Sequence, residues 1–594
     1  MERKEQIREN TWATEDLFPS DEAWKAALEE AKGYLPKIRG LEGRLGESAQ
    51  TLLEGMELDD RLTVDVEALA HYASRKGDED TRVAKYQDMN AQLMALMVDI
   101  ETAGAYESNE ILAIPDETLE DYYAREPRLE GYRRRLEQVR RRREHILSPA
   151  EEALLASAGE LAQGPDNIYS MLCDADMTFP DAVDSQGEHH AVTHGSFVPL
   201  LYSQDRALRK SAFEALYSVY GQYRNTCAAT LSAQVKQLLF FSRARKYPSS
   251  LAAALDSTEV PVEVYHNLIS AVRANLPKLH RYTALRKKLL GVDELHFYDL
   301  YTPIVGDVEM KIPFEEAKET VRQALKPLGE EYAAILDEGF ANRWIDVYEN
   351  TGKRSGAYSA GARVHPYVLL NYHDTLNDVF TLAHEMGHAI HSYRSNRDQP
   401  VAYSDYVIFV AEVASTCNEA LLMEYLLAKT TDRRERAYLI NYFLEQFRTT
   451  LYRQTMFAEF ELKVNELAQR GECVTAEALC DIYRQLNADY FGPDIVVDDQ
   501  IALEWARIPH FYYNFYVYQY ATGYAAAIAL SRRILKEGES AVQDYLQFLS
   551  GGCSADPITL LKGAGVDMAT AEPINQALEL FDRLIGEMEE LMEE

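Results

Sequence analysis

The sequence predicts a mostly α-helical, multi-lobed protein, and three observations favour this fold class. The chain has 594 residues, more than one hydrophobic core usually organises, so two or three lobes with a cleft between them are expected. Its composition, 47% hydrophobic and 26% charged, is that of a globular chain. Apolar residues recur at three- and four-residue steps over long stretches, which is the period of an amphipathic helix.

Individual elements can be predicted in order along the chain. The clearest helical patterns cover residues 23–38, 62–73, 92–106 and 211–241. Residues 129–146 concentrate arginine, which could mimic a nucleic-acid-binding stripe but is interpreted as one helix with a solvated basic face. Residues 177–192 carry β-favouring residues on both sides of a glycine turn and predict a β-hairpin. The last segment, 573–594, has one apolar stripe and predicts a terminal docking helix.

Strong helical periodicity restarts after this hairpin, in residues 203–220, so a lobe boundary is expected near residue 200. The expected division is an N-terminal helical region, 1–199, with the hairpin near 177–192, and a second region, 200–594. The second region contains the histidine cluster described below and is therefore expected to be catalytic.

Charge and cysteine usage limit the partners and the compartment. With 61 basic and 96 acidic side chains the formal net charge is -35, which would repel phosphate backbones and anionic lipid surfaces. Nucleic acid and membrane are therefore not expected as partners. The six cysteines lack CxxC spacing, the N-terminus lacks the apolar core of a signal peptide, and no run of 18 apolar residues occurs. A cytoplasmic location is expected, and the oligomeric state stays open.

Five of the fourteen histidines lie between positions 365 and 391, three of them in the sequence HEMGHAIH. On a helix, His384 and His388 are one turn apart on one face, so both imidazoles can reach a single Zn²⁺ at about 2.0–2.1 Å. Glu385 lies beside them, where a general base acting on water would be needed. The alternative interpretation is an ordinary buried helix whose histidines are satisfied.

A catalytic zinc needs a third protein ligand and an open position. Glu412 is flanked by apolar and small residues, where a carboxylate is costly to bury without a partner, so it is the favoured third ligand. Glu419, two helical turns further on, is the rival ligand or an acceptor for an imidazole N–H. His391 and Asp378 are either outer groups of the same site or plain core and capping residues.

Two further segments could serve a peptide substrate. Residues 364–372 favour β-structure and are interpreted as an edge strand that could pair with an extended chain, or as a purely structural hairpin. Residues 508–527 contain His510 and many tyrosines. Tyrosine stripes are more often core, but His510, Tyr513, Tyr516 and Tyr518 are candidate donors to the oxyanion of a peptide-hydrolysis transition state.

The segments HEMGHAIH, FVAEVAST (409–416) and HFYYNFYVYQYATG resemble oligoendopeptidase F, within the thimet oligopeptidase and neurolysin group of zinc metallopeptidases. TWATEDLFPSDEAW (11–24), SQDRALRKSAF and the segment from GAYSAG to HDTLND extend the resemblance over nearly the whole chain.

The resemblance implies one Zn²⁺ held by His384, His388 and Glu412, with Glu385 as general base and a transition-state donor at His510. It leaves open which tyrosines assist. It also implies a helical fold with a small β-sheet next to the HExxH helix, a deep substrate channel, and endopeptidase activity on short unfolded oligopeptides. A carboxydipeptidase-type exopeptidase and a non-catalytic peptide-binding protein with a structural zinc are the alternatives.

Overall fold

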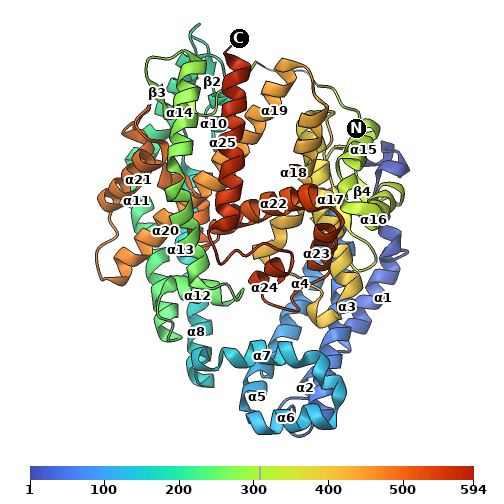
Figure 1. Ribbon diagram of the computed structural model, residues 1–594. Helices are drawn as coiled ribbons and strands as arrows, with labels where there is room; N and C mark the ends of the chain where they lie inside the picture. Colours follow the sequence, from blue (N-terminus) through green and yellow to red (C-terminus); the bar gives the residue numbers. More distant parts are fainter. Residues whose placement is uncertain (307–309, 594) are drawn as a thin grey trace. The chain divides into compact units, whose positions relative to one another are not determined.

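The computed structural model describes residues 1–306 and 310–593, and helices dominate it, as the sequence predicts (Figure 1). The chain divides into two compact units, each assembled from separate stretches. Unit 1 comprises residues 1–144, 310–425 and 530–565, and unit 2 comprises residues 145–309, 426–529 and 566–594. This division differs from the single boundary expected near residue 200, because helices distant in sequence pack together in each unit.

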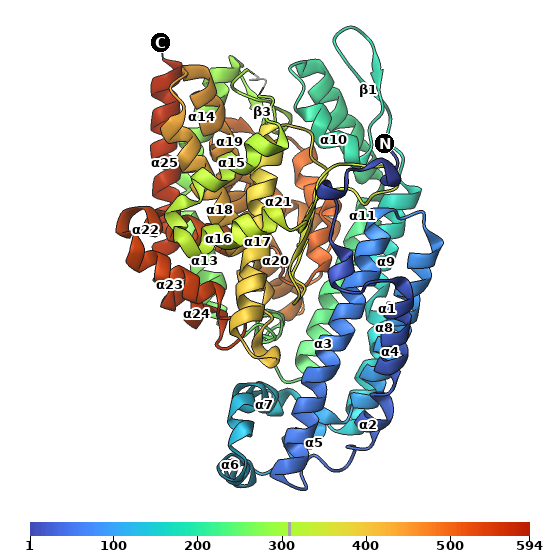
Figure 2. The same ribbon diagram turned by 90° about the vertical axis from the view of Figure 1, so that its right-hand side faces the viewer.

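The N-terminal part of unit 1 is a group of helices that lie side by side in both views (Figures 1 and 2). The long helix α3 (Ala49–Glu79) packs against α1 (Asp21–Lys32) and α4 (Ala84–Gly104). Serines begin two of them: Ser20 accepts from Ala23 N, and Ser48 accepts from Thr51 N. The shorter helices of this part are α2 (Leu35–Arg39), between α1 and α3, and then α5 (Glu107–Ala113), α6 (Asp116–Arg125) and α7 (Arg133–Arg141).

The arginine-rich segment differs from the prediction of one helix with a solvated face. It divides into two 3-10 turns, η4 (Pro127–Tyr132) and η5 (Arg143–His145), on either side of α7. Arg133 pairs with Glu120 and Glu130, and Arg135 with Glu107 at 3.2 Å. Carboxylates of unit 1 therefore neutralise much of the basic face, which a sequence pattern does not reveal because these partners lie on other elements.

The second part of unit 1 carries the histidine motif. Its helices are α15 (Phe314–Ala324), α16 (Gly329–Ala341), α17 (Leu376–Asp398), most of α18 (Ile408–Lys429), the C-terminal part of α22 (Tyr518–Glu537), α23 (Glu539–Leu549) and α24 (Pro557–Gly563). A three-stranded sheet in the order β4-β6-β5 packs against α17. The predicted small sheet next to the HExxH helix is thus confirmed.

The order of strands in this sheet corrects one expectation. β6 (Tyr367–Leu369) is the central strand, parallel to β4 (Ile345–Asp346) and antiparallel to β5 (Tyr358–Ala360), with Ser359 opposite Val368. The apolar stretch interpreted as an edge strand is therefore paired with another strand on each side. The edge strands of this sheet, as far as the described residues show, are β4 and β5, and the glycine-flanked sequence of β5 gave no clear signal.

Unit 2 is organised around α11 (Arg206–Ala244). Its other helices are α8 (Pro149–Ala162), α9 (Gly164–Ser170), α10 (His194–Leu201), α12 (Ser250–Asp256), α13 (Val262–Ala274), α14 (Leu276–Leu290), α19 (Arg433–Gln446), α20 (Arg453–Gln469), α21 (Ala476–Phe491) and α25 (Glu572–Met592). The predicted hairpin is present as β1 (Ala182–Val183) and β2 (His189–His190), antiparallel across a turn with Gly187 at φ 82°. A short parallel pair joins β3 (Leu295–His296) to β7 (Ile495–Val496).

The predicted C-terminal docking helix is confirmed as α25, which packs against α14 and α19 and buries Leu578, Phe581 and Ile585. Figure 2 shows α14 and α25 side by side. Across the described residues, none of the helices combines the length and the apolar character that a membrane span requires.

Candidate metal centre

The histidine motif lies in the middle of α17, whose first turn is fixed by a capping box. Thr375 Oγ1 accepts from Asp378 N at 3.2 Å, and Asp378 Oδ2 accepts from Thr375 N at 2.9 Å. Asp378 therefore caps the helix, the simpler of its two predicted roles. The regular helix that follows places His384 and His388 one turn apart, with ring centroids separated by 4.8 Å.

Three atoms from two helices converge beside this motif. The Nε2 atoms of His384 and His388 lie 3.2 Å apart, and Glu412 Oε2 of α18 lies 3.4 Å from the first and 3.5 Å from the second. Four-coordinate zinc with bonds of about 2.0–2.1 Å separates its ligand atoms by about 3.3 Å, from tetrahedral geometry. The triangle of donor atoms therefore has the size that one tetrahedral zinc ion requires.

Glu385 gives independent evidence that a ligand belongs at this place. Its side chain is only 6% exposed, and its Oε2 atom is buried without a hydrogen-bond partner among the described residues. Burial raises the pKa of Glu385 above its ordinary value, although the neighbouring histidines oppose the shift. A buried carboxylate oxygen without a partner, next to three converging ligand atoms, fits a centre that holds zinc and a water.

Close contact between α17 and α18 brings Glu412 to the histidines. A Cβ atom on Gly387 would lie 2.6 Å from Ser415 Cα and 2.7 Å from Ala414 O, so only glycine permits this approach. The buried side chain of Asn418 fixes the same contact by donating to Ala383 O at 3.0 Å and accepting from the Tyr332 hydroxyl at 2.8 Å. The glycine inside the HExxH motif is thus a packing requirement of the site.

Of the two roles predicted for Glu419, rival ligand or acceptor for an imidazole N–H, its position fits the acceptor. Its Oε1 lies 2.5 Å from His384 Nδ1, which leaves the lone pair of His384 Nε2 facing Glu412. Ser415 Oγ donates to Glu412 Oε2 at 3.2 Å and orients that carboxylate in turn. Each of these partners fixes a ligand without occupying the point where the ligands converge.

His391 belongs to the core of unit 1. It is 1% exposed, stacks on Tyr406 with centroids 3.7 Å apart, and burial lowers its pKa to about 3. A second set of metal-ligating groups, Asp184, Glu188 and His190, lies in the β1–β2 hairpin. Its Asp184 carboxylate already accepts from the backbone of the turn and lies 2.9 Å from His190 Nε2, so it serves the hairpin itself.

The predicted oxyanion donors belong to unit 2, where His510 lies in a short turn, η12 (Pro509–Tyr512). The ring of His510 lies 5.5 Å from that of Tyr513 and 6.0 Å from that of Tyr520, and Tyr516 lies 5.3 Å from Tyr520. Tyr513 is half exposed. The helical register of α22 therefore adds Tyr520 to this group, a residue that the sequence interpretation omitted.

Tyr518 points the other way. It is 2% exposed and packs on Tyr265, at 5.0 Å between centroids, and burial raises its pKa. Its role as an oxyanion donor stays a prediction, and its buried position counts against it. The i, i+2 spacing of Tyr518 and Tyr520 at the start of a helix places them on different faces.

The turn that carries these tyrosines has an unusual backbone. Asn514 and Phe515 both have positive φ values, 56° and 61°, although neither is glycine. Phe515 N donates to the buried Glu461 Oε1 at 2.6 Å, and Gln234 of α11 donates to Tyr512 O and Asn514 Oδ1, both at 3.0 Å. Buried side chains thus hold a strained turn between Tyr513 and Tyr516.

The sequence profile of peptidase family M3 matches residues 199–580, well over half of the chain, and an "Oligopeptidase F" profile matches residues 110–179. The chain belongs to peptidase family M3. It is therefore an enzyme that hydrolyses peptide bonds, and the resemblance inferred from its motifs is confirmed.

Several relatives of this M3 peptidase match it over nearly its full length. Oligopeptidase PepF of Bacillus subtilis is 49% identical over 592 residues, covering 100% of the chain and 88% of the relative. An oligoendopeptidase F homolog of Lactococcus lactis is 40% identical, covering 100% and 98%. Among solved structures, oligoendopeptidase-F of Enterococcus faecium has a TM-score of 0.75 at 39% identity, covering 96% of this chain and 99% of that one.

A putative peptidase of Chlamydophila abortus has a TM-score of 0.94 at 35% identity and covers both chains completely. These likenesses agree with the helical fold, and they show the family independently of the metal-ligand geometry.

Proposed function

We propose that the chain is a zinc-dependent endopeptidase that cleaves internal bonds of short, unfolded oligopeptides. The observation that carries this proposal is the triangle formed by His384 Nε2, His388 Nε2 and Glu412 Oε2, with sides of 3.2–3.5 Å. A site with three protein ligands leaves one tetrahedral position open, which is the pattern of catalytic and not of structural zinc. The adjacent Glu385 supports the same interpretation, because a closed structural site has no use for it.

When bound, zinc polarises the scissile carbonyl and lowers the pKa of a water molecule. Glu385 accepts the proton of the attacking water at its unpartnered Oε2 atom and delivers it to the nitrogen of the leaving amine. Its raised pKa suits both steps, since the carboxylate must hold the proton between attack and bond cleavage. Glu419 keeps His384 in the tautomer that has a free Nε2 lone pair.

His510, together with Tyr513, Tyr516 or Tyr520, would supply neutral donors to the developing oxyanion. Burial lowers the pKa of His510, so its imidazole is neutral at pH 7 and donates one N–H. Replacing Tyr520 or His510 is then expected to lower kcat more than it raises KM.

The substrate class rests on two observations. Relatives of near-full-length similarity are named oligopeptidases and oligoendopeptidases, and β5 lies at an edge of the sheet beside α17, with no further strand paired to it among the described residues. An extended peptide that adds to this edge would bind through its main chain, which gives affinity without strict side-chain preference. The cytoplasmic location and the absence of nucleic-acid partners stay predictions from composition.

The decisive experiment combines a base variant with product mapping. Glu385→Gln is expected to keep one zinc per chain and to lose kcat by at least about 10³-fold, since general-base catalysis contributes roughly 10²–10⁴-fold. Glu330→Gln, an exposed residue in the first turn of α16, is the matched control and should keep wild-type turnover.

Mass spectrometry of an end-blocked peptide separates the two candidate activities. Internal cuts that a chelator abolishes support the endopeptidase. Stepwise loss of C-terminal dipeptides from free peptides, with end-blocked peptides left intact, would establish the carboxydipeptidase instead. Unimpaired cleavage by the Glu385→Gln variant would refute the assigned base.

A further inference from the structure

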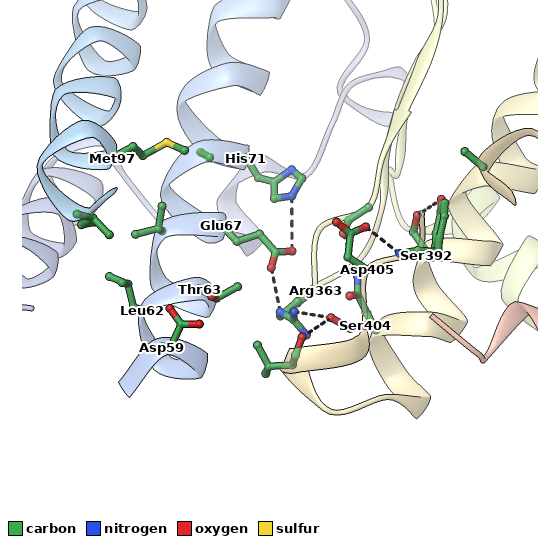
Figure 3. Close-up of a pocket in the computed structure, with 18 of the residues that line it drawn as sticks. Asp59, Leu62, Thr63, Glu67, His71, Met97, Arg363, Ser392, Ser404 and Asp405 are labelled. Carbon is green, nitrogen blue, oxygen red and sulfur yellow. Dashed lines mark hydrogen bonds and ion pairs between the residues drawn. The ribbon is translucent and has the colours of Figure 1, made fainter. Parts of the chain in front are cut away.

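Unit 1 contains a large cavity next to the metal-binding helix, with a volume of about 880 Å³ (Figure 3). One wall is formed by α3 and α4. The opposite wall is formed by β5 and the segment after it, the C-terminal half of α17, and the residues from Val401 to the start of α18. All of these elements belong to unit 1. The roles proposed above for zinc ligands, base and oxyanion donors do not use this cavity.

The cavity begins one helical turn beyond the zinc ligands. Ser392, which lines it, follows His388 by four residues on the same face of α17. Gly361 at the end of β5 packs so closely on Ser392 that a Cβ atom would lie 2.4 Å from Ser392 Cβ. On the α18 side, the lining residue Ala411 directly precedes Glu412. One turn of helix is about 5.4 Å, and an extended peptide advances about 3.3 Å per residue, so a residue within about three positions of the scissile bond can reach the cavity.

Apolar groups cover much of the α3–α4 wall. Leu62 and Val66 of α3 face the cavity together with Met97 and Ile100 of α4. Met97 is 40% exposed, and Ile408 on the opposite wall is 43% exposed, so both walls present apolar surface to the cavity. This surface suits the methylene groups of a long side chain, which would gain from leaving water.

The charged groups of the cavity divide into paired and unpaired carboxylates. Glu67 lies 3.0 Å from Arg363 Nε, and Arg363 also donates to Ser404 Oγ at 2.7 Å (Figure 3). Asp59 pairs with Arg135. Asp405 has no ion pair among the described residues, and the interaction drawn for it is with the backbone N–H of Tyr406 at 3.0 Å.

Glu101 on the opposite wall likewise has no ion pair within the described part of the chain. The surrounding protein atoms desolvate Asp405 and raise its pKa, although its carboxylate stays open to the cavity. Arg363 attracts the Asp405 carboxylate without forming an ion pair with it, and a cation in the cavity would be attracted by Asp405 and Glu101 together.

We propose that this cavity is a specificity site that binds the side chain of a lysine or arginine residue of the peptide, its methylenes against α3 and α4 and its cationic end toward Asp405 and Glu101. The inference rests on the proposed peptidase function and adds a preference to it. A purely apolar side chain would gain nothing from Asp405 and Glu101, and an acidic side chain would meet like charges. A lysine or arginine side chain can place its methylenes on the apolar wall and its charge near the carboxylates.

The test is a set of end-blocked peptides with one cleavable bond, in which lysine, norleucine or glutamate is moved through the three positions on each side of that bond. At one position the wild-type enzyme is expected to prefer lysine over norleucine by about 10-fold in kcat/KM, the order of a charge-assisted hydrogen bond. The preference should weaken as salt is added.

Asp405→Asn is expected to remove most of that preference while leaving kcat/KM for the norleucine peptide within about twofold, and Glu101→Gln should reduce the preference in the same direction. Asp405→Lys should favour the glutamate peptide. Asp99→Asn is the matched control, because it removes one carboxylate from the exposed face of α4 without touching the cavity. Thermal melting of each variant verifies that the fold is intact.

Equal kcat/KM for lysine and norleucine at all positions would overturn this inference and leave the peptidase function standing, since the neutral peptides are still cut. A lysine preference that persists in folded Asp405→Asn and Glu101→Gln variants would also overturn it. Failure of the zinc-loaded wild-type enzyme to cut any peptide would instead refute the proposed function.

Discussion

The glycine between the two candidate metal-binding histidines provides a sharp test of how the site is assembled. Gly387 lies where α17 and α18 touch, and a Cβ atom there would lie 2.6 Å from Ser415 Cα and 2.7 Å from Ala414 O. Both neighbours are backbone atoms, so no side-chain rotation can make room. Gly387→Ala must therefore move one helix relative to the other.

The size of that movement follows from the contact distances. Non-bonded carbon atoms prefer about 3.5–4.0 Å, so the helices must separate locally by roughly 1 Å. Zinc sites tolerate deviations of only about 0.2 Å in ligand distance. We expect Gly387→Ala to displace Glu412 from the two histidines, to weaken zinc binding by roughly 100-fold, at the upper end of the 10–100-fold loss found for outer-sphere changes, and to cost about 1–3 kcal/mol of folding free energy through overpacking.

The assay is competition for zinc against a chelator of known affinity, combined with thermal melting of the metal-free protein. Gly159→Ala is the control, because Gly159 lies inside α8 with nothing within 4 Å of its added Cβ, so that substitution should leave both quantities unchanged or raise the melting temperature. A Gly387→Ala enzyme with wild-type zinc affinity and activity would refute the view that this close helix contact positions Glu412.

Three further outcomes are expected. Glu419→Gln should lower zinc affinity by about 10–100-fold, measured by the same chelator competition, because the amide accepts more weakly from His384 Nδ1; unchanged affinity would contradict the orienting role. Glu461, whose pKa burial raises to about 8, is protonated in the folded state, so its contribution to stability is full below about pH 4.5 and is lost as pH rises through about 8. In denaturant unfolding, the free energy of unfolding of the wild type should therefore fall by roughly 4 kcal/mol more than that of Glu461→Gln between pH 5 and pH 9. If the free energies of both proteins changed with pH in the same way, Glu461 would not be a buried protonated acid. Tyr520→Phe should lower kcat by about 10–10³-fold with KM nearly unchanged if Tyr520 donates to the oxyanion, and a wild-type kcat would exclude it.

The convergence of the three candidate metal ligands could be predicted from sequence because the information for it is local. His384, Glu385 and His388 lie within about one helical turn, and Glu412 stands out because apolar and small residues flank it. Helix content, the β1–β2 hairpin and the C-terminal helix follow from periodicity in the same way. The role of Gly387 could not be predicted, because the spacing of HEMGH does not reveal that α18 packs against this glycine.

Other features depend on tertiary packing and could not be predicted. The exact start of α22 decides whether Tyr518 or Tyr520 shares a surface with His510, and a tyrosine-rich stretch does not mark that start. Which strand lies at the centre of the small sheet depends on strand pairing, and the pairing makes the apolar β6 central, with β4 and β5 at its edges. That Asp405 has no ion pair within the described part of the chain becomes visible only when the neighbours of each carboxylate are known.

The most direct test of the central claim is the zinc content of the purified chain after exhaustive dialysis, measured by mass spectrometry for wild type and for Glu412→Gln. The geometry predicts one zinc per wild-type chain. It predicts a large loss of zinc from the variant, because the third ligand is then a neutral amide in place of the Glu412 carboxylate. A Glu412→Gln chain that retains one zinc at wild-type affinity would contradict the account.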